Sequence, residues 1–274
     1  MKISIITINY NNKDGLKNTI ESVRKQSDKN FEYIIIDGGS TDGSVDIIKN
    51  NEDIIRHWVS ERDKGIYNAM NKGVTRARGK YCLFLNSGDV LHDSDVIGKV
   101  NKCREEADIL FGNVCNISAD GKKHMYVPST DMTLLLIMET GIHHAGSFIK
   151  TELMHKYPYD ETLRICADRK FFIQSLVIDN CNYHNLSFTV CDFELGGISS
   201  TNLDLARKEK WEVMNSLFPP RLVADYRKTN VRIQNMTAML VKSRHKIVTL
   251  ICGLDKCILK LLKLVLRNRF SQNI

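Results

Sequence analysis

YCLFLNSGD, residues 81–89, is the stretch that decides the fold of this 274-residue chain. Its first five residues are apolar or aromatic without alternation, which is typical of a strand covered on both faces in a parallel sheet. A small polar turn follows, and Asp89 is its only charged residue. Ligands of such sheets bind beyond the carboxyl ends of the strands, so Asp89 is a candidate ligand-binding residue on a surface turn. A turn-forming or helix-capping role is the alternative for this aspartate.

Strand-like and helix-like segments alternate on both sides of this stretch. The predicted strands are residues 3–8, 31–36, 54–59, 81–85 and 109–117, and helical spacing of apolar residues occurs at 16–23, 45–48, 66–77 and 96–106. Repeated strand-helix units imply right-handed crossovers and a parallel sheet. We therefore predict an α/β fold with a mostly parallel, Rossmann-like sheet that is flanked by helices.

The strict alternation stops at residue 118. Asp120-Gly121 predicts a hairpin turn, and short strands are expected at 147–149 and 183–191, with helices at 132–138 and from residue 165 onward. Residues 193–200 form a flexible glycine-containing loop whose amides can meet a ligand. Everything after Asn202 has a helical pattern broken at Pro219-Pro220. The prediction is a domain at 1–200 and an α-helical extension at 201–274.

Charge is distributed unevenly along the chain. Residues 201–274 contain 15 Lys and Arg against 5 Asp and Glu, whereas residues 1–200 contain 24 against 27. The basic surplus thus belongs to the C-terminal extension and indicates an anionic surface as its partner. We expect no nucleic-acid partner.

The eight cysteines are typical of reduced core residues. They lie at 82, 103, 115, 166, 181, 191, 252 and 257, without any CxxC spacing. Three of them fall within predicted strands, which favours a cytoplasmic protein over a disulfide framework or a zinc site. The N-terminus enters the first strand at once, and no export signal is visible.

Four carboxylates follow strands or lie in loops on what we expect to be one face of the sheet. They are Asp37, Asp63, Asp89 and Asp168. Each one alone is compatible with a cap or a turn, but their placement after successive strands of one sheet favours a functional site.

Several longer motifs then identify a family. They are residues 4–11 (SIITINYN), 37–44 (DGGSTDGS), 60–73 (SERDKGIYNAMNKG), 84–89 (FLNSGD), His144, 167–168 and 196–199. In this order they resemble family 2 glycosyltransferases of the GT-A fold, especially bacterial enzymes that build exopolysaccharide, capsule or O-antigen. The resemblance covers roughly residues 1–200.

The resemblance implies a role for each matching residue. Asp37 would contact the base of a nucleotide-sugar, Asp89 would bind a divalent cation (Mn²⁺ or Mg²⁺) on the diphosphate, and Asp168 would be the catalytic base. The implied substrate-binding residues are Thr7, Asn9, Asp37, Gly39, Ser40, Asp63, Lys64, Gly65, Asn71, Lys72, Asn86, His144, Gly196 and Gly197. Oxygen ligands suit a hard cation, and a carboxylate can accept the proton of an attacking hydroxyl.

One departure from the family pattern concerns the metal turn. Relatives commonly carry two or three acidic residues there, whereas this chain has Asn86 and Gly88 and keeps only Asp89. Phosphates and water can complete an octahedral shell, so we expect weak metal affinity in the absence of donor. Of the neighbouring histidines, the family position favours His144 for substrate contact, and a structural role remains the alternative for His143.

The end of the chain is predicted to be an amphipathic, basic helix over residues 242–269. Its polar stripe is Thr249, Gly253, Lys256, Lys260, Lys263 and Arg267, and the other positions are largely apolar. Charges near its middle argue against a membrane span and favour binding in the plane of an anionic membrane surface. Packing on the protein's own core or on a dimer partner is the alternative.

The sequence therefore predicts a metal-assisted, inverting glycosyltransferase on the cytoplasmic face of the cell membrane. Residues 1–117 would bind the nucleoside-diphosphate sugar, and residues 118–200 would form the acceptor side. The acceptor would be a glycan, in the most specific form of the hypothesis a polyprenyl-linked one. The alternatives are a nucleotidyltransferase and a membrane-bound nucleotide-sugar-binding subunit without catalysis.

Overall fold

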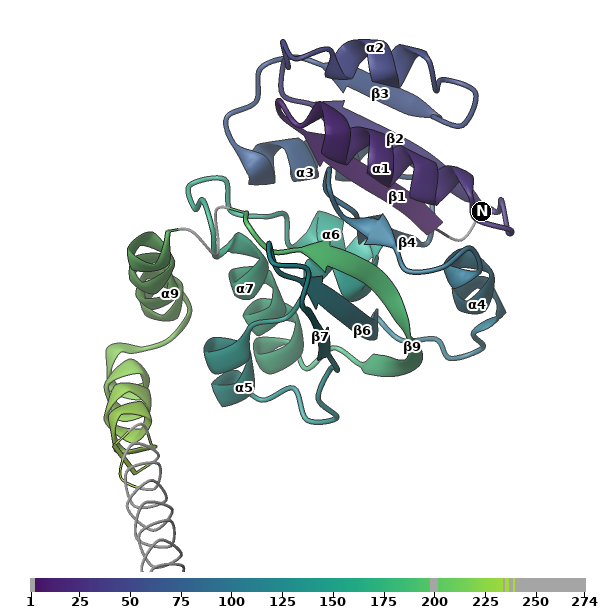
Figure 1. The fold of residues 1–274 in the computed structure, drawn as a ribbon. Coiled ribbons are helices and arrows are strands. Elements are labelled where there is room, and N and C mark those ends of the chain that lie inside the picture. The colour runs from purple at the N-terminus through teal and green to yellow at the C-terminus, as the bar shows by residue number, and fades with distance from the viewer. Residues whose placement is uncertain (1–2, 198–201, 234, 237–238, 240–274) are drawn as a thin grey trace, which may run out of the picture. The chain divides into compact units, whose positions relative to one another are not determined.

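The computed structural model describes residues 3–197, 202–233, 235–236 and 239 (Figure 1). The chain divides into two compact units, Met1–Leu217 and Phe218–Ile274. The predicted amphipathic helix over residues 242–269 lies outside the described residues. Each unit is considered by itself below.

The N-terminal half of the sheet is parallel, as predicted. Its strands are β1 (Ile3–Asn9), β2 (Phe31–Asp37), β3 (His57–Ser60) and β4 (Tyr81–Phe84), in the order β3-β2-β1-β4. The strand predicted at 54–59 begins only at His57, because Ile54 N donates to Asn51 O in a preceding turn. Ile55 nevertheless packs into the core, which explains the apolar pattern.

The second half of the sheet is mixed. Its strands are β5 (Val90–Leu91), β6 (Ile109–Ile117), β7 (Lys123–Tyr126), β8 (Ser147–Lys150) and β9 (Tyr183–Glu194). β8 enters antiparallel between β4 and β6, and β9 runs parallel to β6. The predicted hairpin at Asp120-Gly121 is confirmed by the antiparallel pairing of β6 and β7. Two residues of the predicted 193–200 loop belong to β9, which ends at Glu194.

Helices cover both faces of the parallel strands. Alternate side chains of β1 face different helices: Ile3 and Ile5 share a core cluster with Leu16 and Ile20 of α1 (Lys13–Arg24), whereas Ile6 packs toward α3 (Ile66–Arg76). This two-sided cover explains the continuous apolar run at 81–85. The α/β class is therefore confirmed.

The remaining helices of the first unit are short, apart from the last. They are α2 (Ser44–Lys49), α4 (Val96–Lys102), α5 (Leu134–Thr140), α6 (Thr151–Lys156), α7 (Ala167–Phe172), which continues as a π-helix over Ile173–Ile178, and α9 (Leu203–Leu217). Helix α4 ends at Lys102, four residues before the predicted end. Cys82, Cys115 and Cys191 lie buried and free in β4, β6 and β9, as predicted.

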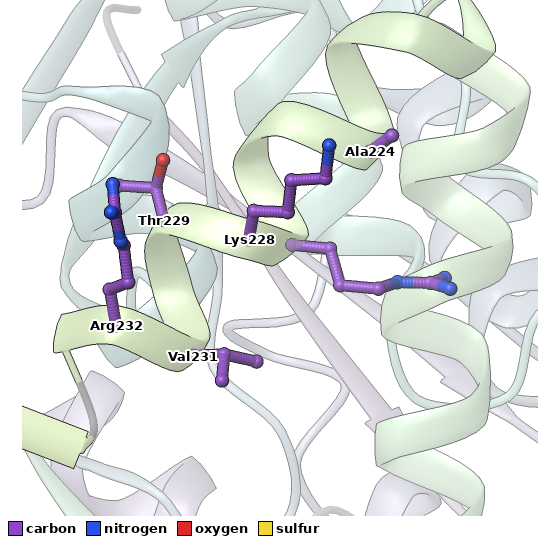
Figure 2. A pocket seen from close by; sticks show the side chains of 6 residues that line it. Ala224, Lys228, Thr229, Val231 and Arg232 are labelled. Atoms are coloured by element: carbon purple, nitrogen blue, oxygen red, sulfur yellow. The ribbon is translucent and has the colours of Figure 1, made fainter.

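The described part of the second unit is helical from Pro220 onward, after the break predicted at Pro219-Pro220. A shallow pocket on this helix is lined by Ala224, Arg227, Lys228, Thr229, Val231 and Arg232 (Figure 2). Three of these side chains are basic, in agreement with the charge surplus of the extension. None of the helices in the described ranges is long and apolar enough to cross a membrane.

Candidate active site

A pocket of about 840 Å³ lies at the carboxyl ends of the parallel strands. The lining comes from the ends of β1–β4 and the loops that follow them, from the start of α3, and from the loop beyond β9. The lining residues are Ile8, Asn9, Tyr10, Gly38, Gly39, Arg62, Asp63, Lys64, Gly65, Ile66, Ala69, Asn86, Ser87 and Gly197. Parallel pairing brings these strand ends to one edge of the sheet. Seven of the predicted substrate-binding residues line this pocket: Asn9, Gly39, Asp63, Lys64, Gly65, Asn86 and Gly197.

Asp37 lies beneath the pocket. Its carboxylate is fully buried and accepts five hydrogen bonds, from Asn9 Nδ2, Ser60 Oγ, Gly39 N and both the amide and the hydroxyl of Ser40. Burial raises the pKa of this carboxyl, but the hydrogen bonds from Ser40 and Ser60 outweigh burial, and the pKa is lowered overall. Asp37 therefore holds the Gly39-Ser40 loop in place as an ionised group.

Thr7 is also placed under the pocket. Its hydroxyl donates to Leu85 O at 2.7 Å and lies 3.0 Å from the hydroxyl of Tyr33, and the residue is fully buried. These contacts connect β1 to the chain leaving β4. Thr7 supports the strand ends from within the core.

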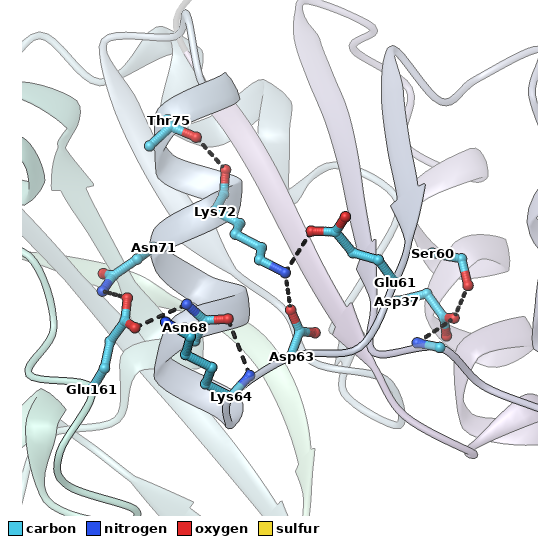
Figure 3. Close-up of polar contacts among 11 residues, drawn as sticks. Asp37, Ser60, Glu61, Asp63, Lys64, Asn68, Asn71, Lys72, Thr75 and Glu161 are labelled. Carbon is cyan, nitrogen blue, oxygen red and sulfur yellow. Dashed lines mark hydrogen bonds and ion pairs between the residues drawn. The ribbon is translucent and has the colours of Figure 1, made fainter.

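Lys72 braces the segment that follows β3, and Asn71 braces the loop before α7 (Figure 3). Lys72 Nζ forms ion pairs with Glu61 at 2.7 Å and Asp63 at 2.6 Å. Burial raises the pKa of Asp63 despite the opposing effect of Lys72. Asn71 Nδ2 donates to Tyr159 O and to Glu161 Oε1, so this residue anchors the loop before α7.

A chain of polar contacts runs from the pocket to Asp168. Asn86 Nδ2 lies 3.1 Å from His144 Nε2, and His144 Nδ1 lies 3.6 Å from Asp168 Oδ2. An amide nitrogen donates, so Nε2 accepts in this contact, whereas the distance from Nδ1 to Asp168 is too long for a hydrogen bond. Tyr67 Oη lies 3.3 Å from Asp168 Oδ1. Asp168 does not line the pocket itself but is connected to it through His144.

Asp89 is buried, with 4% of its surface exposed, so the expectation of a surface turn was wrong. The turn folds under α1, where Thr19 Oγ1 donates to Asp89 O. Burial raises the pKa of the Asp89 carboxyl to about 7, and the nearby His144 opposes this shift. Its Oδ2 atom has no hydrogen-bond partner among the described residues. A buried carboxylate oxygen without a partner is costly when it is ionised, and it is therefore a candidate ligand for a cation.

A divalent cation fits this environment. Asn86 Oδ1 is a second buried oxygen without a partner in the described part of the chain. Hard cations prefer such oxygen ligands. Among the same residues, no group of three or more His, Cys, Asp or Glu side chains is arranged to hold a metal.

His143 has a structural environment. Its ring packs edge-on against Tyr126 at 4.7 Å and Phe193 at 5.2 Å between centroids. Burial lowers its pKa to about 4, with a further contribution from His144. The alternative of a structural histidine therefore fits His143. Gly196 lies next to the pocket residue Gly197, beyond the end of β9.

Some site residues were not assigned from the sequence. Tyr10 and Arg62 line the pocket, and Tyr10 is 69% exposed; an aromatic side chain in a strand-end turn was the available signal. Tyr67 lies within the 60–73 motif but was not assigned a role. Its contact with Asp168 spans 101 residues of chain, and no local pattern encodes such a contact.

The chain belongs to glycosyl transferase family 2, which it matches over residues 4–169. An uncharacterized glycosyltransferase of Mycobacterium tuberculosis is 31% identical over 208 residues, which cover 72% of this chain and 77% of the relative. A PGL/p-HBAD biosynthesis glycosyltransferase of Mycobacterium bovis is 30% identical over 211 residues, covering 73% and 80%. The family predicted from the motifs is confirmed, and the chain is a glycosyltransferase.

Solved structures with the same fold include S. aureus TarS 1-349 in complex with UDP-GlcNAc, with a TM-score of 0.61 and 19% identity. The alignment covers 82% of this chain and 66% of the TarS 1-349 chain. A mannosyltransferase from Pyrobaculum calidifontis in complex with GDP-Man and Mn²⁺ has a TM-score of 0.52 and 13% identity, covering 69% and 56%. At these identities the likeness concerns the fold, and it confirms the predicted GT-A architecture.

The raised pKa of Asp89 predicts a pH dependence of stability in the metal-free protein. The folded-state pKa of about 7 lies above the ordinary value of 3.8, so the folded protein keeps this proton longer than the unfolded chain. The stabilisation is fully present below about pH 4 and is lost as the pH rises through about 7. Asp89→Asn lacks this titration.

The prediction is checked by urea unfolding of both proteins with EDTA between pH 5 and pH 8. The stability of the wild-type protein should fall relative to Asp89→Asn across this range. A difference that stays constant with pH would contradict the raised pKa.

Proposed function

We propose that the chain transfers a sugar from a nucleoside-diphosphate sugar, bound in the strand-end pocket, to a hydroxyl group of a growing glycan. The observation that carries the proposal is the pocket of about 840 Å³ that reaches Asn86 and, through His144, the Asp168 carboxylate. Its volume suits a nucleotide-sized ligand. The UDP-GlcNAc and GDP-Man of the two similar structures support a nucleotide-sugar donor.

Two kinds of group in the pocket lining would bind different parts of the donor: a glycine backbone would bind the base, and basic side chains would bind the diphosphate. The Gly38-Gly39 backbone, ordered by Asp37 from below, would bind the base, because glycines let a ring approach the chain closely. Arg62 and Lys64 line the same pocket and would bind the diphosphate through charge-assisted hydrogen bonds. Asp63 pairs with Lys72, and this ion pair would keep the segment from Arg62 to Lys64 in position.

Asp89, assisted by Asn86 Oδ1, would bind the divalent cation. When bound, such a cation neutralises the charge that develops on the leaving diphosphate. The unpartnered Asp89 oxygen supports this role, and the Mn²⁺ of the similar mannosyltransferase structure agrees with it. Because burial raises the pKa of the carboxyl to about 7, protons would compete with the cation for this site at neutral pH.

Asp168 would act as the catalytic base. Its side chain is 23% exposed; Tyr67 Oη lies 3.3 Å from its Oδ1 atom, and His144 Nδ1 lies 3.6 Å from its Oδ2 atom. It would accept the proton of the acceptor hydroxyl as that oxygen attacks the anomeric carbon. Attack on the face opposite the diphosphate inverts the anomeric configuration. Family membership disfavours the nucleotidyltransferase and the non-catalytic subunit as alternatives.

The acceptor and the cellular site are proposed from the C-terminal extension. Its basic surplus suits an anionic membrane surface. Arg227, Lys228 and Arg232 are basic residues of this extension that lie within the described residues. Binding at the cytoplasmic face of the membrane would hold residues 118–200, the proposed acceptor side, near polyprenyl-linked glycans. Residues 1–117 would serve the donor.

Incubation with a panel of UDP- and GDP-sugars and Mn²⁺ tests the proposal. We expect transfer or slow hydrolysis of one donor with release of its nucleoside diphosphate. Asp168→Asn should reduce transfer by roughly 10²- to 10⁴-fold, because the amide cannot accept the proton, and should leave the affinity for that nucleotide unchanged. Full turnover in the variant, or a product with retained anomeric configuration in its NMR spectrum, would exclude this role for Asp168.

The cation role of Asp89 is tested by nucleotide affinity. Mn²⁺ should tighten the binding of UDP or GDP to the wild-type protein, and Asp89→Asn should abolish this effect while leaving metal-free binding intact. Calorimetric titrations of the nucleotide in the presence of Mn²⁺ and in the presence of EDTA measure its affinity with and without the metal. Lys13→Gln, outside the pocket lining, is the control. If Mn²⁺ tightens nucleotide binding equally in the wild-type protein and in Asp89→Asn, Asp89 is not the ligand.

Membrane binding is tested by cosedimentation with vesicles of anionic lipid at low salt. The full chain should sediment, because each lysine near such a surface contributes about 1 kcal/mol. A chain that ends at Ser243 should stay in solution and still bind nucleotide, and neutral vesicles are the control. Failure of the full chain to sediment, or resistance to both salt and carbonate extraction from cell membranes, would contradict interfacial binding.

A further inference from the structure

A buried glutamate lies outside the segment that matches the family. Glu209 belongs to α9, and only 4% of it is exposed. Its Oε1 atom accepts the amide N–H of Arg164 at 2.8 Å, and its Oε2 atom accepts those of Ile165 at 2.8 Å and Cys166 at 3.0 Å. One carboxylate thus binds three consecutive backbone amides.

These amides lie directly before α7, the helix that carries Asp168 in its first turn. The amides of Arg164, Ile165 and Cys166 precede the helix and its internal hydrogen bonds, so they need acceptors from elsewhere in the chain. Burying a carboxylate is unfavourable unless hydrogen bonds replace its water, and three N–H donors do so here. The contact is therefore specific in geometry as well as in charge.

Both backbone polar groups of Ile165 are hydrogen-bonded. Its N–H donates to Glu209, and its carbonyl oxygen accepts from Tyr67 Oη at 2.6 Å. The same hydroxyl lies 3.3 Å from Asp168 Oδ1. Tyr67 comes from α3, next to the pocket residue Ile66, so the backbone before Asp168 is fixed between the donor pocket and α9.

We propose that Glu209 is a positioning residue for Asp168. Resting on the proposed function, this inference makes α9 part of the catalytic unit, although it follows the family-matched segment. Without the hydrogen bonds between Glu209 and the 164–166 amides, the backbone of Ile165 would keep only its contact with Tyr67. The Asp168 carboxylate could then move away from the acceptor hydroxyl. A displacement of about 1 Å is enough to lower a rate by about 100-fold.

Glu209→Gln tests the inference, because the amide keeps the shape but turns one acceptor into a donor that opposes a backbone N–H. Glu212→Gln is the matched control, since Glu212 lies exposed on the same helix and pairs with Lys208. Hydrogen exchange of residues 164–168 is measured in both full-length variants. Kinetics with the donor selected from the panel follow at a temperature where both variants are folded.

In Glu209→Gln, we expect exchange of the 164–168 segment to accelerate at least about tenfold, which reports local opening. The kcat should fall roughly 10- to 100-fold, while the affinity for UDP or GDP and the donor KM change less than about twofold. Glu212→Gln should match the wild-type protein in every measurement. This split between kcat and KM separates positioning from a general loss of structure.

Unchanged exchange at 164–168 in Glu209→Gln, or a wild-type kcat despite faster exchange, would overturn the inference. A parallel loss of kcat and nucleotide affinity would do the same, because it signals general disruption. If the wild-type protein uses no donor of the panel, the proposed function fails, while hydrogen exchange still decides whether Glu209 holds the backbone before Asp168.

Discussion

The parallel pairing of β1 between β2 and β4 is the constraint on which the site depends. It places Asn9 beside Asp37, and it brings Ser87 N to within hydrogen-bond distance of Ile8 O. Polar residues that are far apart in sequence therefore leave the sheet at one edge. The pocket is a direct result of this register, because a shift of one residue would place Asn9 and Asp37 on opposite faces of the sheet.

The antiparallel insertion of β8 next to β4 completes the site. His144 begins the short 3-10 turn that leads into β8, so the pairing of β8 with β4 delivers this histidine to Asn86. α7 then brings Asp168 to the other ring nitrogen. The first half of the sheet thus forms most of the pocket, and the later segments of the chain supply His144 and Asp168, whose catalytic roles are proposed above.

Two buried aspartates differ in how well they are satisfied. Asp37 accepts five hydrogen bonds, and its pKa is lowered because these bonds outweigh burial. Asp89 keeps an oxygen without a partner in the described structure, and burial raises its pKa to about 7. A satisfied carboxylate orders a loop, whereas an unsatisfied one can still bind a cation. The same residue type therefore has two different environments at the strand ends on either side of β1.

The sequence alone determined the strands, the alternation of β and α elements and the family, because side-chain periodicity and turn residues are local properties of the chain. Strands β1 and β6 were predicted nearly to the residue, as was the position of Asp89 beyond β4. Only the tertiary structure decided that Asp89 is buried, that His144 connects Asn86 to Asp168, and that Glu209 holds the backbone before α7. Burial and hydrogen-bond satisfaction depend on atoms from distant segments, and no local pattern records which of those segments will meet.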